Sequence, residues 1–327
     1  MSRKLTAREE RWPIAGVFTI ARGSKTEARV LVVEIEDKGL IGRGEGVPYP
    51  RYDETPEKSL AEIEGVRAAI ESGCDRARLN GLLPAGAARN ALDCALWDLE
   101  AKQTGVPVWR RAKLTRPAPV VTAFTLSLAA PEAMAEAARA AAGRPILKLK
   151  IGGPDDLDRI AAVRAAAPAA RLIVDANEAL AFEDLRRLTP QMARLGVVLI
   201  EQPLKAGEDE ALKNFVSAVP LCADESLHTR KDLAACVGLY GCINIKLDKT
   251  GGLTEAVALA AEARAKGLTI MAGCMVATSL SMAPALLIAQ GAAFVDLDGP
   301  LLLAKDREPG LVFRGSTVEP PEPGLWG

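Results

Sequence analysis

The feature that most constrains the fold is a repeat in the last two thirds of the chain. From about residue 120, short apolar runs end in a polar residue, and each run is followed by a stretch rich in Ala, Leu and Arg. This alternation of short strands and helices is typical of a parallel sheet. The run ends lie 22 to 28 residues apart, at Thr125, Lys150, Asp175, Glu201, Asp224, Lys246, Cys274 and Asp296. Eight units of this length favour a TIM-type barrel, whose reactive groups lie at the C-terminal strand ends.

An open doubly wound sheet could show the same repeat, but no G-x-G-x-x-G or P-loop sequence follows a strand here. We therefore predict an α/β fold with an eight-stranded modified TIM barrel over 116–299, in which the last helix can be missing. An N-terminal α+β capping domain is predicted over 1–115. The tail, 300–327, is rich in Pro and Gly, and we expect it to run over the surface and return to the cap.

The first third of the chain mixes strand and helix patterns. Residues 17–21 and 27–36 read as strands, and Asp37-Lys38-Gly39 reads as a turn into a further strand at 40–46. Apolar residues at helical spacing predict a helix over 87–102. Its apolar stripe must pack on a neighbour, most simply the barrel domain.

Composition excludes several classes of function. With 41 Lys and Arg against 42 Asp and Glu, the chain has no surplus of positive charge for a nucleic acid backbone. The start of the chain is polar and no run approaches the ~20 apolar residues that span a bilayer, so we expect a cytoplasmic protein without a membrane partner. The six cysteines form no C-x-x-C pair, which argues against a zinc module or a disulfide framework. A single histidine, His228, excludes a His-rich metal site.

Two lysines share one face of the strand predicted near residue 148. In the sequence Ile146-Leu147-Lys148-Leu149-Lys150-Ile151, the period of two residues places Lys148 and Lys150 on the same side. The opposite side is apolar and should meet the helices, so both lysines are expected to point into the barrel. Burying an ammonium is costly without a nearby anion or a lowered pKa. The alternative is a strand end whose lysines extend to water. The residues that end the neighbouring strands distinguish these two interpretations.

Carboxylates end the next three predicted strands. Asp175, Glu201 and Asp224 each follow an apolar run, so they should converge at the mouth of the barrel. Three clustered negative charges repel one another unless a cation lies among them, and all-oxygen ligation suits Mg²⁺. Any one of them alone could be a helix cap or part of a surface salt bridge. Their occurrence on consecutive strands makes that alternative a poor explanation for all three.

A third inward lysine, Lys246, ends the following strand. In an eight-stranded ring, the strands that carry Lys150 and Lys246 lie on opposite sides, so the two amines should face each other across the metal. A carboxylate substrate held by Mg²⁺ and Lys148 can lose its α-proton, because the enediolate charge is stabilised. One lysine can then remove a proton from one face while the other returns one to the opposite face. Both amines need a pKa lowered towards the operating pH, and we expect burial and neighbouring positive charge to lower it. A Schiff-base lysine, the alternative, would not need three carboxylates nearby.

Further residues are candidates for binding a substrate. Asp296 and Asp298 follow the last predicted strand and share a face, which suits a substrate ammonium, while a loop cap or a structural pair is the alternative. Arg22 lies in the loop after the first strand, and the cap could bring its planar guanidinium over the barrel to bind a carboxylate. Most loop arginines are simply solvated. Met275 and its neighbour Cys274 more often indicate packing than nucleophilic catalysis.

With these residues assembled, the chain resembles the enolase superfamily over nearly its whole length, and most closely the dipeptide epimerases (L-Ala-D/L-Glu type) of the muconate-lactonizing subgroup. The resemblance implies that Lys150 and Lys246 are the acid/base catalysts. It also implies that one Mg²⁺ is bound by Asp175, Glu201 and Asp224, and the substrate by Arg22, Thr125, Lys148, Met275, Asp296 and Asp298. Some relatives carry an acidic residue shortly after the G-C-M sequence. Here Val276-Ala277-Thr278 is neutral, which bears on selectivity for the first residue of the dipeptide.

The resemblance implies an Mg²⁺-dependent epimerase of the cytoplasm that inverts the α-carbon of the C-terminal residue in small dipeptides such as L-Ala-L-Glu and L-Ala-D-Glu, with murein peptides as their source. A second interpretation keeps the site and changes the substrate, as in muconate cycloisomerase, o-succinylbenzoate synthase or N-acyl amino acid racemase. Asp296 and Asp298 have no obvious use against a substrate that lacks an ammonium. A third interpretation is a catalytically silent barrel that binds peptides. The oligomeric state stays open, a homo-oligomer included.

Overall fold

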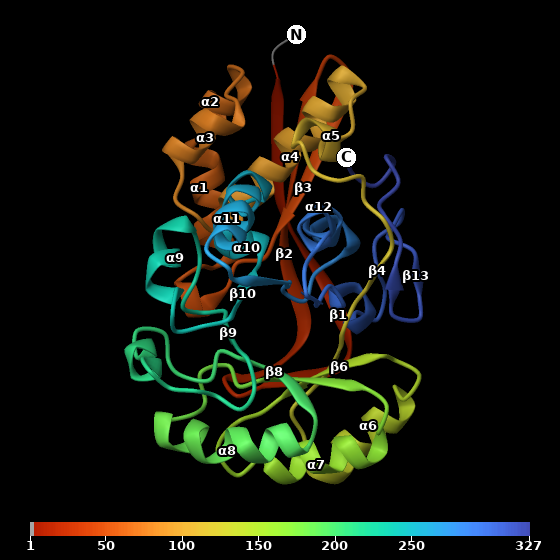
Figure 1. The fold of residues 1–327 in the computed structure, drawn as a ribbon. Coiled ribbons are helices and arrows are strands. Elements are labelled where there is room, and N and C mark those ends of the chain that lie inside the picture. Colours follow the sequence, from red (N-terminus) through yellow and green to blue (C-terminus); the bar gives the residue numbers. More distant parts are fainter. Residues whose placement is uncertain (1–2) are drawn as a thin grey trace.

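The computed structural model describes residues 3–327 and begins with an antiparallel sheet (Figure 1). Its order is β1-β2-β3, with β1 (Lys4–Ile20), β2 (Gly23–Asp37) and β3 (Leu40–Gly46). The predicted turn Asp37-Lys38-Gly39 joins β2 to β3. β1 begins at Lys4 rather than at residue 17, because its polar first half pairs with the apolar middle of β2. The composition of that half does not indicate a strand by itself.

A group of helices follows this sheet. They are the 3-10 turn η1 (Pro50–Tyr52) and the α-helices α1 (Pro56–Gly65), α2 (Arg67–Glu71), α3 (Arg76–Leu82), α4 (Ala87–Thr104) and α5 (Val108–Arg111). The helix predicted over 87–102 is α4. It ends at Gly105, whose φ of 64° is the left-handed conformation that favours glycine.

Helix α4 lies between the sheet and the barrel. Toward the sheet, glycines at alternate positions of β3 let the helix approach backbone to backbone: a Cβ on Gly44 would lie 2.1 Å from the carbonyl oxygen of Ala91. Toward the barrel, Asn90 Nδ2 donates a hydrogen bond to Asp248 Oδ1 (2.8 Å). The guanidinium of Arg89 also donates to the backbone oxygens of Thr250 (2.7 Å) and Gly251 (3.1 Å). The helix is therefore fixed on both sides.

The contact at Gly44 leads to a stability prediction. Gly44→Ala is expected to lower the free energy of unfolding by ~1–3 kcal/mol or more, because the atoms that a Cβ would meet are helix backbone and cannot yield alone. Urea denaturation measures this loss. Gly65→Ala is the matched control, since nothing lies within 4 Å of a Cβ added there. Equal stability of the two variants would contradict the close packing of α4 on β3.

Parallel strands form the second, eight-stranded sheet, in the order β12-β11-β10-β9-β8-β7-β6-β5. They are β5 (Phe124–Leu126), β6 (Ile146–Lys150), β7 (Arg171–Asp175), β8 (Val197–Glu201), β9 (Leu221–Ala223), β10 (Cys242–Ile245), β11 (Thr269–Ala272) and β12 (Phe294–Val295). The amide of Ala123, just before β5, donates to the carbonyl oxygen of Val295 on β12 (2.8 Å). The two edge strands therefore meet, and the curled sheet forms the predicted modified barrel.

Helices follow most of these strands on the outside of the barrel (Figure 1). They are α6 (Pro131–Ala140), α7 (Leu157–Ala166), α8 (Phe182–Arg194), α9 (Arg230–Cys236), α10 (Leu247–Thr250), α11 (Leu253–Ala265) and α12 (Ser279–Ala289). After β12 the structure has the 3-10 turn η3 (Gly299–Leu302), which confirms that the last helix can be missing. After β8 it has η2 (Asp209–Leu212) where the repeat predicts a helix, because this charged segment has no apolar stripe of helical period. Across residues 3–327, no helix has both the length and the apolar character to span a membrane.

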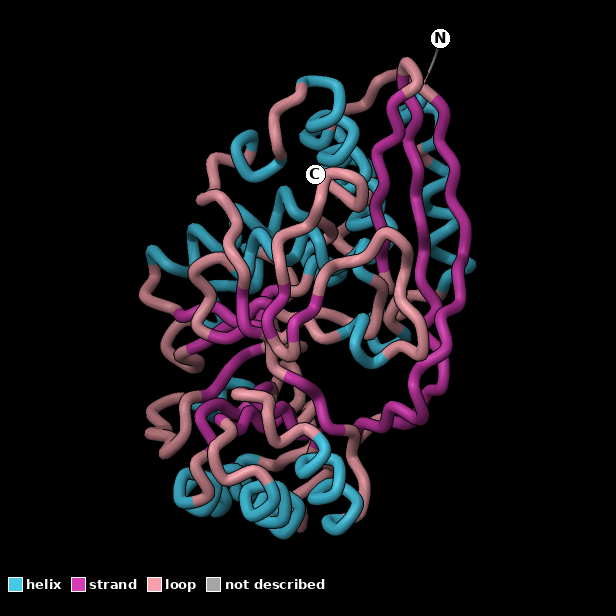
Figure 2. Tube along the Cα trace, turned by 90° about the vertical axis from the view of Figure 1, so that its right-hand side faces the viewer, coloured by secondary structure: helices cyan, strands magenta, loops and turns pink. Residues whose placement is uncertain are grey.

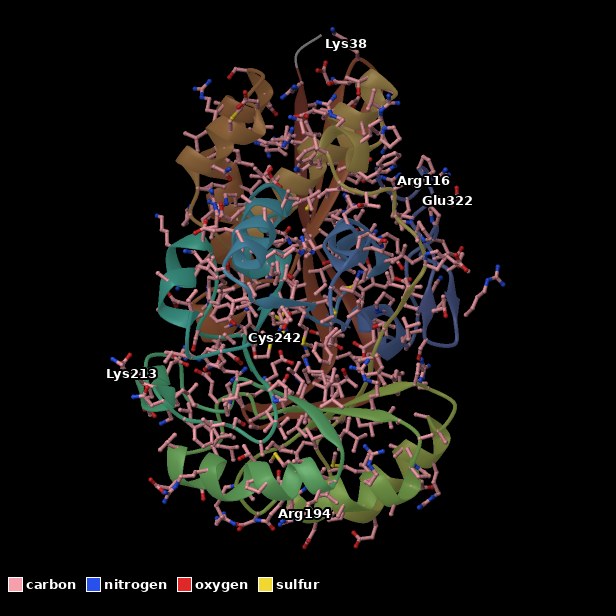
Figure 3. The ribbon with its side chains drawn as sticks, in the orientation of Figure 1. Lys38, Arg116, Arg194, Lys213, Cys242 and Glu322 are labelled. Atoms are coloured by element: carbon pink, nitrogen blue, oxygen red, sulfur yellow. The ribbon has the colours of Figure 1, made fainter. Side chains whose placement is uncertain are left out.

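The inside of the barrel is layered. Its lower layer is an apolar cluster of Ala123, Ile146, Ile173, Leu199, Cys222, Cys242 and Met271; Cys242 is labelled in Figure 3. Two residues further along the strands, side chains on the same face are polar or charged: Lys148, Asp175, Glu201, Asp224 and Asn244. The period of two residues therefore places a charged layer directly above an apolar one, at the C-terminal strand ends.

The tail returns along the barrel to the first helices. β13 (Phe313–Arg314) pairs with β14 (Thr317–Val318), and β14 pairs with β4 (Val120–Val121), which precedes the barrel. At the end of the chain, Trp326 Nε1 donates to the carbonyl oxygen of Cys94 on α4 (3.0 Å). The backbone amide of Gly327 donates to Asp98 Oδ1 (2.9 Å). The last residues thus contact the central helix of the N-terminal segment.

Candidate functional site

A cavity of about 820 Å³ lies between the β1–β2 hairpin and the mouth of the barrel. Nine of the predicted site residues line it: Arg22, Thr125, Lys148, Lys150, Asp224, Lys246, Met275, Asp296 and Asp298. The other two, Asp175 and Glu201, are fully buried and contact Lys148 from below the cavity wall. The fold thus brings residues from distant parts of the chain together at one end of the barrel.

Lys148 lies at the centre of the charged layer. Its Nζ is 2.7 Å from Glu201 Oε2, 2.8 Å from Asp296 Oδ2 and 3.1 Å from Asp175 Oδ2. Burial lowers the pKa of Lys148, but Asp296, Glu201 and Asp175 outweigh burial and hold the pKa well above its usual value. The neighbouring carboxylates therefore favour the ammonium form of Lys148. This lysine links the last strand of the barrel to strands β7 and β8.

Lys150 and Lys246 contact different carboxylates. Lys150 Nζ lies 2.5 Å from Asp175 Oδ2, and Lys246 Nζ lies 2.6 Å from Asp224 Oδ2. Strands β7, β8 and β9 separate the strand of Lys150 from that of Lys246, so the two amines approach from opposite sides of the ring. Burial raises the pKa of Asp175, but Lys150 and Lys148 outweigh burial and the net direction is downward.

The lowered pKa predicted for Lys246 is wrong for this arrangement. Burial does lower the pKa of Lys246, as the sequence argument supposed, but the carboxylates of Asp224 and Glu201 outweigh burial. The net pKa lies well above the usual value for lysine, because an adjacent anion stabilises the ammonium more than desolvation penalises it. Asp224 and Glu201 therefore favour the ammonium form of Lys246.

The carboxylate oxygens fit a divalent cation. Glu201 Oε2 and Asp224 Oδ1 are buried and accept no hydrogen bond of suitable geometry, although a lysine Nζ lies 2.7 Å and 2.6 Å away, respectively. Burial and the Asp175 carboxylate raise the pKa of Glu201 to about 7. Hard, negatively charged oxygens of this kind suit Mg²⁺. Within residues 3–327, no group of three or more His, Cys, Asp or Glu side chains is already arranged to hold a metal, and Lys148 lies between Asp175 and Glu201.

Two buried residues beside the carboxylates were not predicted. Lys249 Nζ lies 2.6 Å from Asp224 Oδ1 and donates to the carbonyl oxygens of Asp224 (2.5 Å) and Asn244 (3.0 Å). Asn244 Nδ2 donates to Glu201 Oε1 (2.7 Å). The period of two residues before Lys246 would have indicated Asn244. Lys249 lies on the short helix α10, where no strand pattern applies.

The two aspartates after β12 have different environments. Asp296 contacts Lys148, as described above, and its Oδ1 is buried without a hydrogen bond. Asp298 Oδ2 accepts a hydrogen bond from the backbone amide of Thr125 (2.6 Å). Burial and the Asp296 carboxylate raise the pKa of Asp298 to about 7. Among the neighbours, Cys274 has a pKa well above its usual value, mainly because of burial, which disfavours the thiolate needed for nucleophilic catalysis.

Arg22 does reach over the barrel from the turn between β1 and β2. Figure 2 shows the end of this hairpin bending toward the barrel. One terminal nitrogen of Arg22 donates to the carbonyl oxygen of Asn177 (2.8 Å) and to Glu178 Oε2 (3.1 Å). The other terminal nitrogen donates to Tyr49 Oη (2.9 Å) and to Glu225 Oε1 (2.7 Å). The predicted position of Arg22 is thus found, with protein groups as its partners.

Comparisons with known proteins agree with this geometry. Residues 2–111 match the family model "Mandelate racemase / muconate lactonizing enzyme, N-terminal domain", and residues 132–325 match "Enolase C-terminal domain-like". The L-Ala-D/L-Glu epimerase of Escherichia coli (strain K12) is 50% identical over 93% of this chain and 96% of its own length. The N-acetyl-D-glutamate racemase of a Pseudoalteromonas species is 48% identical over 91% of this chain and 95% of its own length.

A solved structure is also closely similar. It is an enolase family member from Agrobacterium tumefaciens with homology to dipeptide epimerases, with bound sodium and L-Ala-L-Glu. Its TM-score is 0.98 at 52% identity, and the match covers 99% of this chain and 100% of that one. Sequence, fold and site geometry lead to the same conclusion: this chain belongs to the enolase superfamily, with the N- and C-terminal domains of its mandelate racemase / muconate lactonizing enzyme branch.

Proposed function

We propose that this chain is an Mg²⁺-dependent dipeptide epimerase that inverts the α-carbon of the C-terminal residue in dipeptides such as L-Ala-L-Glu. The observation that carries the proposal is the placement of Lys150 on β6 and of Lys246 directly after β10, on opposite sides of the eight-stranded ring and each beside its own carboxylate. Inversion needs exactly one amine on either face of a planar intermediate, and a single amine could only return the proton to the face it left. The relatives that match nearly the whole chain are named as epimerases and racemases.

The residues divide into a metal site and a proton-transfer site. Asp175, Glu201 and Asp224 would hold one Mg²⁺, and the bound cation supplies a Lewis acid for the substrate carboxylate. Lys148, whose ammonium form the neighbouring carboxylates favour, donates a hydrogen bond to that carboxylate and stabilises the enediolate charge.

Proton transfer then involves one amine on each face of the substrate carbon. Lys150 accepts the α-proton on one face, and the ammonium of Lys246 donates a proton on the other. In the reverse direction the two lysines exchange these roles. Because Asp224 and Glu201 raise the pKa of Lys246, the amine can act as a base only when those carboxylates are neutralised by a cation.

Other parts of the proposal concern the substrate and the protein around it. Asp296 and Asp298 bind the dipeptide ammonium, Thr125 positions Asp298 through its amide, and Met275 and Arg22 contribute to the cavity wall.

We divide the chain into a cap (1–115), a barrel (116–299) and a tail (300–327) that returns to the cap. The contacts of Trp326 and Gly327 with α4 support this division. We also propose a cytoplasmic enzyme that acts on murein peptides.

N-acetylglutamate racemisation is the second candidate, because a relative with 48% identity bears that name. N-acetylglutamate has no ammonium, so it would not use Asp296 and Asp298, whose carboxylates line the cavity. This difference favours the dipeptide as substrate.

The test uses ¹H NMR in D₂O with Mg²⁺ and either L-Ala-L-Glu or N-acetyl-L-glutamate. We expect the glutamyl α-proton of the dipeptide to exchange and L-Ala-D-Glu to accumulate, with much slower exchange in N-acetyl-L-glutamate. Faster turnover of N-acetyl-L-glutamate would replace the first candidate by the second. Exchange in neither compound would contradict the proposed function.

A further inference from the structure

Asp224 differs from the other two predicted metal ligands in how its backbone is held. Asp175 and Glu201 are the last residues of β7 and β8, and they are paired with each other in the sheet. β9 ends at Ala223, so Asp224 lies just beyond its strand. The next helix, α9, begins only at Arg230. The backbone of Asp224 therefore needs a partner other than the regular ladder to keep its carboxylate beside the other two.

The side chain of Gln202 is that partner. The ladder between β8 and β9 continues to the backbone amide of Gln202, which donates to the carbonyl oxygen of Cys222 (2.9 Å). In a regular parallel ladder, the amide of Asp224 would then donate to the backbone carbonyl of Gln202. Gln202 has a left-handed backbone (φ 33°), and its carbonyl oxygen accepts from Glu178 on the side of β7 instead (2.9 Å). Its side-chain Oε1 replaces that carbonyl and accepts from the amides of Asp224 (2.8 Å) and Ser226 (3.1 Å).

The other half of the Gln202 amide group determines which way the oxygen points. Gln202 is fully buried. Its Nε2 donates to the carbonyl oxygen of Leu204 (2.8 Å), to Ser226 Oγ (2.8 Å) and to Tyr240 Oη (3.3 Å). A backbone carbonyl can only accept and a backbone amide can only donate, so a flipped side chain would place like groups together at both ends. The oxygen is therefore held toward Asp224.

A carboxylate completes this network from the side of η2. Asp209 lies on η2, which stands in the place of the helix predicted after β8. It accepts hydrogen bonds from Ser226 Oγ (2.8 Å) and Tyr240 Oη, and its Oδ1 lies 3.4 Å from Gln202 Nε2. Burial and the Asp209 carboxylate raise the pKa of Tyr240, so the phenol keeps its proton and remains a donor. The charged segment thus places an anion beside the donor end of Gln202.

Asp224 is held at both of its backbone polar groups. Gln202 accepts a hydrogen bond from its N–H, and Lys249 Nζ donates to its carbonyl oxygen (2.5 Å). With the backbone fixed on both sides, the carboxylate of Asp224 has little freedom to move away from Asp175 and Glu201. Groups that orient metal ligands in this way affect the affinity for the metal, although they do not touch it.

We propose that Gln202 is a positioning residue of the metal site. Its side chain extends the β8–β9 ladder by one residue and holds Asp224 where this carboxylate can bind Mg²⁺, while Asp209 and Tyr240 keep the Gln202 amide group oriented. This inference rests on the proposed function, in which Asp224 is a metal ligand. Gln202 acts through Asp224 and takes no part in proton transfer.

The test measures the Kd for Mg²⁺ without a substrate, by isothermal titration calorimetry. Gln202→Met keeps nearly the shape of the side chain but removes its amide group. We expect the Kd to rise by ~10- to 100-fold, the usual effect of losing a residue that supports a metal ligand. Tyr240→Phe acts one step further from the metal and should raise the Kd by ~2- to 10-fold, the loss of one neutral hydrogen bond.

Alpha-proton exchange in L-Ala-L-Glu gives a second readout. In Gln202→Met, the Mg²⁺ concentration that gives half the maximal exchange rate should rise with the Kd. The maximal rate at saturating Mg²⁺ should stay close to that of the parent protein, because the amines and the substrate contacts are unchanged.

Two controls separate positioning from stability. Gln103→Met is the same change at an exposed glutamine of α4. Gly44→Ala lowers stability at the contact between β3 and α4. Both should leave the Kd for Mg²⁺ unchanged, and thermal unfolding in the presence of a chelator gives the stability of each variant without metal.

A Kd for Mg²⁺ in Gln202→Met equal to that of the parent protein would overturn the inference, however far the metal-free Tm falls, because Gln202 would then support only the fold. If Gln202→Met does not fold, an unchanged Kd in Tyr240→Phe overturns it in the same way. An equal rise of the Kd in Gly44→Ala would also overturn it. Failure of the proposed function has a different signature, since the parent protein would then exchange no α-proton at any Mg²⁺ concentration.

Discussion

Lys246→Ala is expected to abolish epimerisation while α-proton exchange continues from only one of the two diastereomers, L-Ala-L-Glu or L-Ala-D-Glu. The variant lacks the amine on one face, so the proton on that face can be neither removed nor delivered. Loss of a general acid or base costs ~100- to 10,000-fold in rate, and inversion requires both. Lys150→Ala should show the mirror pattern, with exchange restricted to the other diastereomer.

The neighbouring charges make this experiment interpretable. In Lys246→Ala, Lys249 still lies 2.6 Å from Asp224. In Lys150→Ala, Lys148 still lies 3.1 Å from Asp175. Neither variant therefore leaves a buried carboxylate without a cation. The control is Lys213→Ala, at an exposed lysine far from the cavity (Figure 3). Equal slowing of exchange from both diastereomers in each lysine variant would show that the two amines do not act on separate faces.

Chelation of divalent cations should remove all α-proton exchange, and added Mg²⁺ should restore it. The matching substitution is Glu201→Gln, which keeps the size of the side chain and an oxygen for the hydrogen bond from Asn244, but removes one negative charge. We expect the affinity for Mg²⁺ to fall by more than ~100-fold. Substitution of residues that only hydrogen-bond to metal ligands already lowers metal affinity by about 10- to 100-fold. Thermal unfolding measures the weaker Mg²⁺ binding as a smaller rise in Tm when Mg²⁺ is added, because a cation that binds only the folded chain raises Tm.

Glu210→Gln is the control for this change, because Glu210 is an exposed residue of η2 whose ion pair is with the exposed Lys213. Its Mg²⁺-dependent rise in Tm should match that of the parent protein. An equal rise in Glu201→Gln, or α-proton exchange that survives chelation, would show that Glu201 is not a ligand or that no cation is needed.

Much of the site could be predicted because parallel strands end at one edge. The spacing of apolar runs located each strand end, and the period of two residues placed Lys148 and Lys150 inside. The pattern could not show that Lys148 reaches Asp296 across the closure of the barrel, since this contact depends on side-chain length and ring curvature. Nor could the pattern show whether the pKa of Lys246 is raised or lowered, because the shift depends on the distances from Lys246 to Asp224 and Glu201.

The residues missed by sequence reasoning lack a local signal. Lys249 lies on the short helix α10, and its position 2.6 Å from Asp224 Oδ1 follows from the fold of the chain and not from a strand pattern. The first half of β1 is polar and becomes a strand only through its partner β2. The segment after β8 follows the length of the repeat but not its apolar pattern, so the spacing alone predicted a helix where η2 is found.

Helix α4 has a consequence for how a dipeptide reaches the centre of the molecule. The same helix is packed against the glycines of β3 and bonded to Asp248, Thr250 and Gly251, just beyond Lys246. A rigid rotation of the whole N-terminal unit would therefore break buried hydrogen bonds and disturb the backbone next to Lys246, the proposed acid/base residue. Bending of the β1–β2 tip breaks the four hydrogen bonds of Arg22 and those of Val17 and Thr19 with residues 127 and 128, but none of these touches the backbone beside Lys246. We expect the tip to act as the gate, and the rest of the unit to stay still during turnover.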